Sequence, residues 1–221
     1  MNPIRVLILE DHAAMLKNLS RLIETSVNTQ LVGTAMSAEE AIVLLDQLEN
    51  LPEVILCDIN LPKMTGTDFC RLVKIKYPEI ELLMLTVSDD NEQVLAAVRR
   101  GAAGYLLKGV ESNKILSAIE DVHAGGSVIQ PSLARKLLEH FKPTSQSYDT
   151  QGEPYRRSLT ERELECLQII AKGLSNIEAA SVLGLSKATI RTHLEHIYQK
   201  LDVCNRVEAV TEGLRQGLIG I

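Results

Sequence analysis

The sequence has few cysteines and no long apolar segment. Its four cysteines are scattered singly, with no CxxC pair and no histidine at the spacing of a metal site. This pattern indicates neither a disulfide framework nor a zinc site, and buried free thiols are the simpler interpretation. No stretch approaches the roughly 18 apolar residues of a membrane-spanning helix, and the apolar run at 4–9 leads into acidic residues without a cleavage-like site. We therefore expect a cytoplasmic protein with no membrane partner.

A strong excess of positive charge is also missing. The chain has 221 residues, room for two domains of common size, and is 45% hydrophobic and 24% charged, as soluble globular proteins are. Residues 1–154 carry 14 basic and 21 acidic side chains, whereas residues 155–221 carry 9 and 8. The C-terminal part can therefore approach nucleic acid, but hardly by charge alone.

Short apolar runs alternate with helix-periodic segments in the first half of the chain. These runs are residues 4–9, 31–35, 54–57, 82–86 and 104–107. Strands that alternate with helices at this spacing predict a parallel sheet covered on both faces. The first domain is therefore predicted as an α/β domain of the (βα)5 type, residues 1–125.

A connecting region follows at residues 126–157. It begins with a helix-like piece at 132–141 and continues at 142–157 as a polar stretch that contains proline and glycine and has no period. This composition is typical of a flexible linker.

Residues 158–221 have a purely helical pattern. Capping boxes at Thr160 and Ser175 mark two helix starts, and Gly184 then separates two apolar-periodic segments. Ser186 is a suitable N-cap for the second of these segments. Helix, short glycine turn and helix predict a helix-turn-helix within an all-α domain.

Polar side chains follow the predicted strands of the first domain. Glu10 and Asp11 follow the first strand, Asp58 ends the third, Thr86 ends the fourth and Lys108 follows the fifth. Ligands of open parallel sheets bind at this edge. Three crowded carboxylates need a cation, and hard oxygen ligands suit Mg²⁺. Such a site presents Asp58 as a nucleophile towards a phosphoryl group, with Lys108 and the ion neutralising charge.

Further spacings match known families. Pro62 and Gly66 follow Asp58, and Tyr105 precedes Lys108 by three positions. With the acidic cluster, this set resembles the receiver domain of bacterial two-component response regulators. The segments LTERELECLQIIAKGLSNIEAA and NRVEAV resemble the LuxR-type output domain of the NarL/FixJ subfamily. The resemblance implies a flavodoxin-like parallel sheet of order 2-1-3-4-5, joined by the linker to the helix-turn-helix domain.

The resemblance implies roles for the acidic residues. Asp58 would be phosphorylated by a sensor histidine kinase or a small phosphodonor. Glu10, Asp11, Asp58 and the backbone carbonyl of Asn60 would bind Mg²⁺ or Mn²⁺.

The resemblance also implies a switch. Lys108 would pair with the phosphoryl oxygens, Thr86 would hydrogen-bond one of them, and Tyr105 would change rotamer as Thr86 moves. The trigger is an added charge of about −2. Gly109 stands where the family often has proline or aspartate, which leaves the geometry of that loop open.

The second helix of the helix-turn-helix is expected to enter the major groove. If Ile190, Leu194 and Ile197 face the domain core, a helical wheel places the DNA-facing side chains on the opposite face and its flanks. The predicted contacts are Ser186, Lys187, Ala188, Thr189, Arg191, Thr192, Glu195 and His196. Arg191 is the strongest of these candidates and could read guanine or hold phosphate.

Two positions predict weak binding by a single copy. Family members often carry basic residues where Glu195 and Ile177 stand. Glu195 could accept from cytosine or simply repel phosphates. We therefore expect a homodimer, formed on phosphorylation, to bind paired half-sites. A last apolar stripe is interpreted first as core and secondly as the dimer contact that the resemblance suggests: Val207, Val210 and Leu214.

The predicted function is that of a DNA-binding response regulator controlling transcription. Its receiver would assist its own phosphorylation and dephosphorylation without being an enzyme in the usual sense. An aspartate-nucleophile phosphatase is an alternative, but such enzymes usually have a second aspartate where Asn60 stands. A second alternative is a phosphorylation-independent regulator that binds protein. The small excess of basic residues in the helix-turn-helix domain leaves this alternative open.

Overall fold

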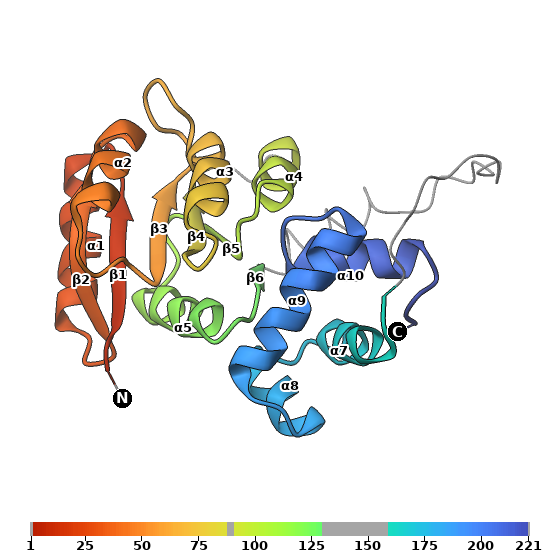
Figure 1. Ribbon diagram of the computed structural model, residues 1–221. Coiled ribbons are helices and arrows are strands. Elements are labelled where there is room, and N and C mark those ends of the chain that lie inside the picture. The colour runs from red at the N-terminus through yellow and green to blue at the C-terminus, as the bar shows by residue number, and fades with distance from the viewer. Residues whose placement is uncertain (1, 88–90, 130–158, 221) are drawn as a thin grey trace.

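The computed structural model describes residues 2–87, 91–129 and 159–220 (Figure 1). The described residues form an α/β domain and a helical domain. The helix predicted at 132–141 and the linker at 142–157 lie outside the described residues. Within the described ranges, no helix is long and apolar enough to cross a bilayer.

The α/β domain is built on one parallel sheet. The strand order is β2-β1-β3-β4-β5-β6. The strands are β1 Ile4–Leu9, β2 Thr29–Ala35, β3 Val54–Asp58, β4 Glu81–Thr86, β5 Gly104–Leu107 and β6 Val128–Ile129. The predicted order of the first five strands is confirmed. The sheet also continues into β6, beyond residue 125, through pairing of Val128 with Gly104.

Five helices cover the two faces of this sheet. They are α1 Ala13–Thr25, α2 Ala38–Gln47, α3 Gly66–Lys76, α4 Asn91–Arg99 and α5 Ser112–His123. Helices α1 and α5 cover one face, and α2, α3 and α4 cover the other. Strands β1, β3 and β4 are therefore buried on both sides, which explains why they are continuous apolar runs, whereas the edge strand β2 is partly exposed.

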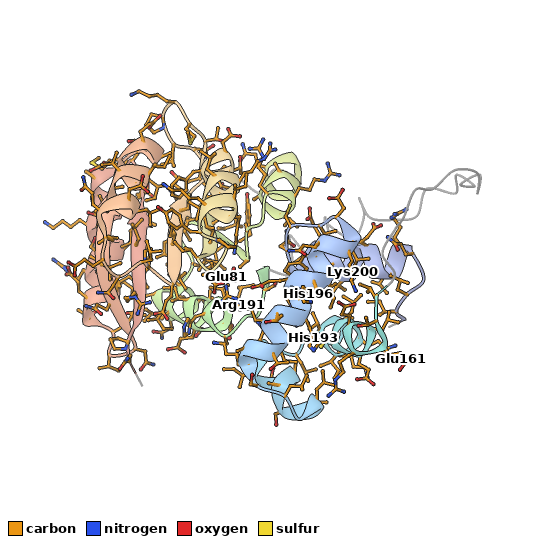
Figure 2. All side chains as sticks on the ribbon, viewed as in Figure 1. Glu81, Glu161, Arg191, His193, His196 and Lys200 are labelled. Carbon is orange, nitrogen blue, oxygen red and sulfur yellow. The ribbon has the colours of Figure 1, made fainter. Side chains whose placement is uncertain are left out.

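The helical domain contains the predicted helix-turn-helix. Its helices are α7 Glu161–Ala171, α8 Asn176–Leu183, α9 Lys187–Leu201 and α10 Arg206–Arg215. Both predicted capping boxes are present, at Thr160 and Ser175. Gly184 ends α8 in the left-handed conformation, with φ +65°, and so turns the chain into α9. The side chains of Arg191, His193, His196 and Lys200 extend from α9 (Figure 2).

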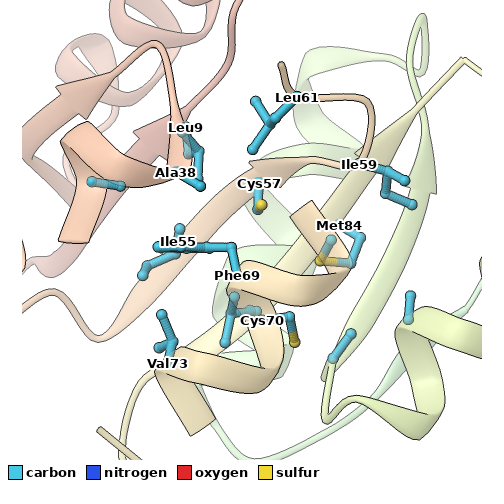
Figure 3. Close-up of a cluster of buried hydrophobic side chains, with 14 of the residues drawn as sticks. Leu9, Ala38, Ile55, Cys57, Ile59, Leu61, Phe69, Cys70, Val73 and Met84 are labelled. Atoms are coloured by element: carbon cyan, nitrogen blue, oxygen red, sulfur yellow. The ribbon is translucent and has the colours of Figure 1, made fainter. Parts of the chain in front are cut away.

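The core of the α/β domain has two parts, one on each face of the sheet. Leu7 and Leu9 of β1 join a cluster with α2, α3 and α4, whereas the intervening Ile8 joins a cluster with α1 and α5. Figure 3 shows the first cluster, in which Phe69 of α3 packs with Ile55 of β3. Alternate strand residues thus serve opposite faces, as the two-residue period of a strand requires.

All four cysteines are free thiols, as predicted. Cys57, Cys70 and Cys166 are also buried as predicted, whereas the prediction of burial is wrong for Cys204, which is exposed in the loop before α10. Burial raises the pKa of the Cys70 thiol to about 12, which keeps it protonated and unreactive at neutral pH.

Candidate functional site

The predicted acidic cluster forms at the carboxyl edge of the sheet. The register places Leu9 opposite Cys57, so Glu10 and Asp58 emerge together from neighbouring strands. Carboxylate oxygens of Glu10, Asp11 and Asp58 all lie within 4.8 Å of one another. Glu10 and Asp58 are buried, with 0% and 4% exposure, while Asp11 is exposed. One side of the cluster is therefore open to solvent.

Lys108 neutralises part of this charge. Its Nζ lies 2.7 Å from Glu10 Oε2 and 2.9 Å from Asp58 Oδ2. The backbone N–H of Lys108 donates to Thr86 O at 2.6 Å, which fixes the start of its loop. Burial alone lowers the pKa of Lys108, but hydrogen bonds and attraction from Glu10 and Asp58 outweigh it and raise the pKa above its usual value. Lys108 is thus a fixed cation beside Asp58.

The donor set fits a hard divalent cation. Three carboxylates offer only oxygen ligands, the type that Mg²⁺ prefers. Glu10 Oε2 is buried beside Lys108 Nζ, and a carboxylate oxygen has a second lone pair that can bind a cation. The neighbouring Asn60 donates its backbone N–H to Asp58 Oδ1 at 3.3 Å, which holds the carboxylate of Asp58 in place.

The structure explains why Gly66 follows Asp58 at a fixed spacing. The loop after β3 folds back so that Gly66 N–H donates to Ile59 O at 2.9 Å. A Cβ atom on Gly66 would lie 1.9 Å from the backbone oxygen of Asp58. Only glycine allows this close approach, which packs the start of α3 against the end of β3.

The two predicted switch residues are both buried. Thr86 ends β4 with 0% exposure, and Tyr105 of β5 has 1% exposure. Tyr105 belongs to the same core cluster as Ala97 and Val98 of α4. The loop after Lys108 continues through a trans peptide bond, which resolves the geometry left open at Gly109.

Helix α9 buries the predicted stripe and exposes much of the predicted DNA face. Ile190, Leu194 and Ile197 are buried in the core of the helical domain. The exposed candidates are Ser186, Lys187, Ala188, Thr192, Glu195 and His196, whereas Thr189 and Arg191 are partly buried. Ser186 and Thr189 also cap the helix, because Ser186 Oγ accepts from Thr189 N at 3.0 Å.

The α/β domain lies against one side of α9. Arg191 Nη1 forms an ion pair with Glu79, and Lys187 Nζ donates to His123 O at 3.3 Å. A cavity of about 720 Å³ separates the two domains beside these contacts, and Glu81 and Arg191 both line it. Figure 2 shows Arg191 on the side of α9 that faces the α/β domain. The strongest DNA-binding candidate is therefore engaged by the other domain.

Helix α10 is also held by the α/β domain. Val207 packs against the core cluster of that domain, whereas Val210 and Leu214 pack in the core of the helical domain. The core interpretation of this stripe thus holds for Val210 and Leu214. A dimer contact through Val207 requires the two domains to separate first.

A buried arginine that the sequence did not single out connects the domains. Arg206, in the NRVEAV segment, is 9% exposed. Its guanidinium donates to Gly125 O at 3.0 Å and to Asn176 Oδ1 at 3.4 Å. It also donates to the backbone oxygens of Ile170, in the last turn of α7, and of Leu174, in the loop that follows. Burial lowers the pKa of Arg206. A single arginine gives no periodic signal, so only its place in the matched segment could have drawn attention to it.

The fold and the sites define a class of protein. Residues 6–120 match the family model described as "Response regulator receiver domain", and residues 157–212 match "Bacterial regulatory proteins, luxR family". The chain is therefore a response regulator, in which a receiver domain is joined to a LuxR-type DNA-binding domain. It belongs to the response-regulator family of transcription factors, as the resemblance predicted.

Relatives of known name match over nearly their whole length. The transcriptional regulatory protein MctR of Rhizobium johnstonii is 33% identical over 216 residues, which cover 98% of this chain and 95% of MctR. The response regulator protein VraR of Staphylococcus aureus is 32% identical over 216 residues, covering 98% and 99%.

Solved structures share the architecture. The response regulator ChrA of a heme-sensing two-component system is 30% identical, with a TM-score of 0.51 over 99% of this chain and 100% of ChrA. The two-component response regulator RcsB in complex with DNA has a TM-score of 0.57 at 21% identity, over 97% of this chain and 99% of RcsB, and supports the fold alone.

Proposed function

We propose that phosphorylation of Asp58 controls DNA binding by the helical domain. The observation that carries this proposal is the cluster of Glu10, Asp11 and Asp58, with Lys108 in contact with two of the three. An exposed side of the cluster gives a sensor histidine kinase or a small phosphodonor access to Asp58. A carboxylate oxygen of Asp58 attacks phosphorus, and the bond between phosphorus and the donor breaks.

The ion would be held by Glu10, Asp11, Asp58 and the backbone carbonyl of Asn60. Mg²⁺, or Mn²⁺ in its place, supplies charge neutralisation for the transferred phosphoryl group. Lys108 is 2.9 Å from Asp58 Oδ2 and so pairs with a phosphoryl group on that carboxylate. The charge of the acyl phosphate is thereby balanced by residues already in place.

The added charge of about −2 would be sensed by Thr86 and Tyr105. Thr86 ends the strand beside Asp58, and Tyr105 packs with Val98 of α4. Helix α4 in turn contacts α10, since the carbonyl of Val98 accepts from the side chain of Asn205. Strands β4 and β5 and helix α4 would carry the signal from Asp58 to the helical domain.

The structure corresponds to a closed form in this proposal. Glu79 forms an ion pair with Arg191, and the α/β domain covers Val207 of α10. Phosphorylation shifts the population towards an open form, in which α9 is free for DNA and Val207 for a second copy. The expected complex is a homodimer on paired promoter half-sites, contacted by the predicted face from Ser186 to His196. We accordingly expect the protein to act in the cytoplasm, where its DNA partner is.

The same site disfavours the phosphatase alternative. The second acidic residue of an aspartate-nucleophile phosphatase would stand at Asn60, which is an amide that cannot serve as a general acid. The receiver therefore assists only its own phosphorylation and dephosphorylation. Release of more than one equivalent of phosphate from a phosphate ester would favour the enzyme instead.

One sample can test the phosphoryl site and the output together. The full chain is incubated with acetyl phosphate and Mg²⁺, its intact mass is measured, and its binding to promoter DNA is followed by gel shift at several salt concentrations. We expect one added phosphoryl group and tighter DNA binding, both absent in Asp58→Asn. Phosphate uptake by Asp58→Asn would refute the nucleophile, and unchanged DNA binding in the phosphorylated protein would favour a phosphorylation-independent regulator.

A further inference from the structure

Arg191 of α9 is held by two carboxylates of different origin. Its Nε lies 3.4 Å from Oε1 of Glu195, one turn further along the same helix. Its Nη1 forms an ion pair with Glu79, which lies between α3 and β4 of the other domain. The guanidinium therefore presents one edge to its own helix and another edge outwards.

Separation of the domains would affect these two partners differently. Glu79 would leave with the α/β domain, whereas Glu195 would stay because it is four residues from Arg191 on α9. Glu195 would still restrain the orientation of the guanidinium. The outer edge, which had paired with the carboxylate of Glu79, would become available to another acceptor. A carboxylate offers two adjacent oxygen acceptors, and the major-groove edge of guanine offers two adjacent acceptors as well, O6 and N7.

The charge around Arg191 then favours a contact with a base over a contact with a phosphate. The Arg191–Glu195 pair has no net charge. Of the exposed residues near Arg191 on α9, Ala188 and Thr192 are uncharged, and Lys187, one turn earlier, is a separate cation that can bind phosphate by itself. A DNA phosphate would meet the carboxylate of Glu195 beside the guanidinium and be repelled. The edge of guanine carries no net charge, so it meets the donors of Arg191 without this penalty.

We infer that Glu195 is a positioning residue that directs Arg191 to guanine in the major groove. The inference rests on the proposed function, because it assumes that the freed α9 binds DNA. It also gives Glu195, the residue that departs from the usual basic character of this position, a specific use. The site recognised by one copy then contains a G·C pair read by Arg191, and Glu195 reduces binding to DNA backbone in general.

The test compares base discrimination in variants of the full, phosphorylated chain. A preferred site is first selected from random-sequence DNA with the wild-type protein, and each of its G·C pairs is then replaced by A·T. Arg191→Ala should lose about tenfold or more of the discrimination at one G·C pair. Glu195→Gln should lose discrimination at that same pair, bind unrelated DNA more tightly, and increase the salt dependence by about one phosphate contact.

Glu165→Gln is the matched control. Glu165 forms an exposed ion pair with Arg162 on α7, so the variant removes the same charge from a similar pair on a helix other than α9. It should leave the discrimination at every base pair unchanged. The discrimination ratio is independent of the fraction of open protein, because that fraction multiplies both affinities alike.

The outcomes separate the inference from the proposed function. If phosphorylated wild-type protein selects no DNA sequence, the proposed function fails and the inference fails with it. If wild-type protein selects a site but Glu195→Gln keeps full discrimination, or loses it at a different base pair from Arg191→Ala, the inference alone is refuted. Equal melting temperatures of the variants and the wild type show that the comparison concerns recognition rather than folding.

Discussion

The side-chain amide of Asn205 donates a hydrogen bond to the carbonyl oxygen of Val98, across the boundary between the two domains. The same side chain caps α10, because its Oδ1 accepts from the backbone N–H of Glu208 at 2.9 Å. The side-chain nitrogen of Asn205 therefore binds the end of α4, and its side-chain oxygen caps the start of α10. These two roles can be separated by a single substitution.

Asn205→Asp should open the protein without phosphorylation. Aspartate caps a helix as well as asparagine does, so α10 should keep its stability. The donor to Val98 is lost, however, and a carboxylate is placed against the negative end of the α4 dipole. We expect DNA affinity without phosphodonor to rise by about tenfold, which corresponds to roughly 1.4 kcal/mol, and small-angle X-ray scattering to show a more extended molecule.

Asn18→Asp provides the same charge change on the exposed side of α1, away from the helical domain. It should behave as wild type in both measurements. A compact Asn205→Asp protein with wild-type DNA affinity would contradict the role of this hydrogen bond.

Gly125→Ala should separate the domains by a steric route. A Cβ atom on Gly125 would lie 2.0 Å from the Nδ2 of Asn176, and the glycine has φ +85°. Gly173→Ala introduces similar backbone strain at φ +87°, but its Cβ would have no atom within 4 Å. Limited proteolysis and scattering should therefore show opening in Gly125→Ala and a closed form in Gly173→Ala, whereas equal behaviour of the two variants would assign the effect to strain alone.

Mg²⁺ should stabilise the α/β domain through the acidic cluster. At a concentration tenfold above its dissociation constant, an ion that binds only the folded state adds about 1.4 kcal/mol to the free energy of unfolding. Thermal unfolding with increasing Mg²⁺ should show this rise in the wild type and a much smaller one in Asp11→Asn. Asp121→Asn removes an exposed carboxylate of α5 and should respond as the wild type does. An equal rise in Asp11→Asn would place the ion elsewhere.

Glu163 should make the helical domain sensitive to acid. Burial alone raises the pKa of Glu163, but hydrogen bonds from Lys200 and Thr160 outweigh it, so the pKa lies below its usual value of 4.5. A lowered pKa in the folded state means that the stabilisation is complete above pH 4.5 and is lost as the pH falls below that value.

Glu163→Gln tests this source of stability, because it keeps the capping box but loses the ion pair with Lys200 at 2.7 Å. We expect a loss of about 2 kcal/mol at pH 7 and a weaker dependence of the melting temperature on pH below 4.5. An unchanged pH dependence in Glu163→Gln would show that other groups cause the acid sensitivity.

The acidic cluster could be predicted from the sequence because it follows from a local rule. Its carboxylates follow apolar runs in the sequence, and the carboxyl ends of parallel strands meet at one edge. The stripe of α9 was predicted correctly for a similar reason, since Ile190, Leu194 and Ile197 repeat with the period of a helix. In contrast, β6 has only two residues and shows no periodicity, so it was not predicted.

The contacts between the domains could not be predicted in this way. Asn205 and Val98 are 107 positions apart, and neither belongs to a pattern that refers to the other. Glu79 and Arg191 form an ordinary pair of opposite charges, of which the sequence offers many combinations. Such contacts depend on how two folded domains pack together, and this packing leaves no helical or strand periodicity in the sequence.

The cavity between the domains is lined by residues at the amino ends of the strands, among them Arg5, Glu53 and Glu81, whereas Asp58 lies at the carboxyl end. The helical domain therefore leaves the end of the sheet that carries Asp58 uncovered in the closed form. If phosphorylation controls DNA binding as proposed, a phosphodonor can reach Asp58 before the domains separate. Covalent modification and domain opening are then successive events, and a kinase need not recognise a molecule that is already open.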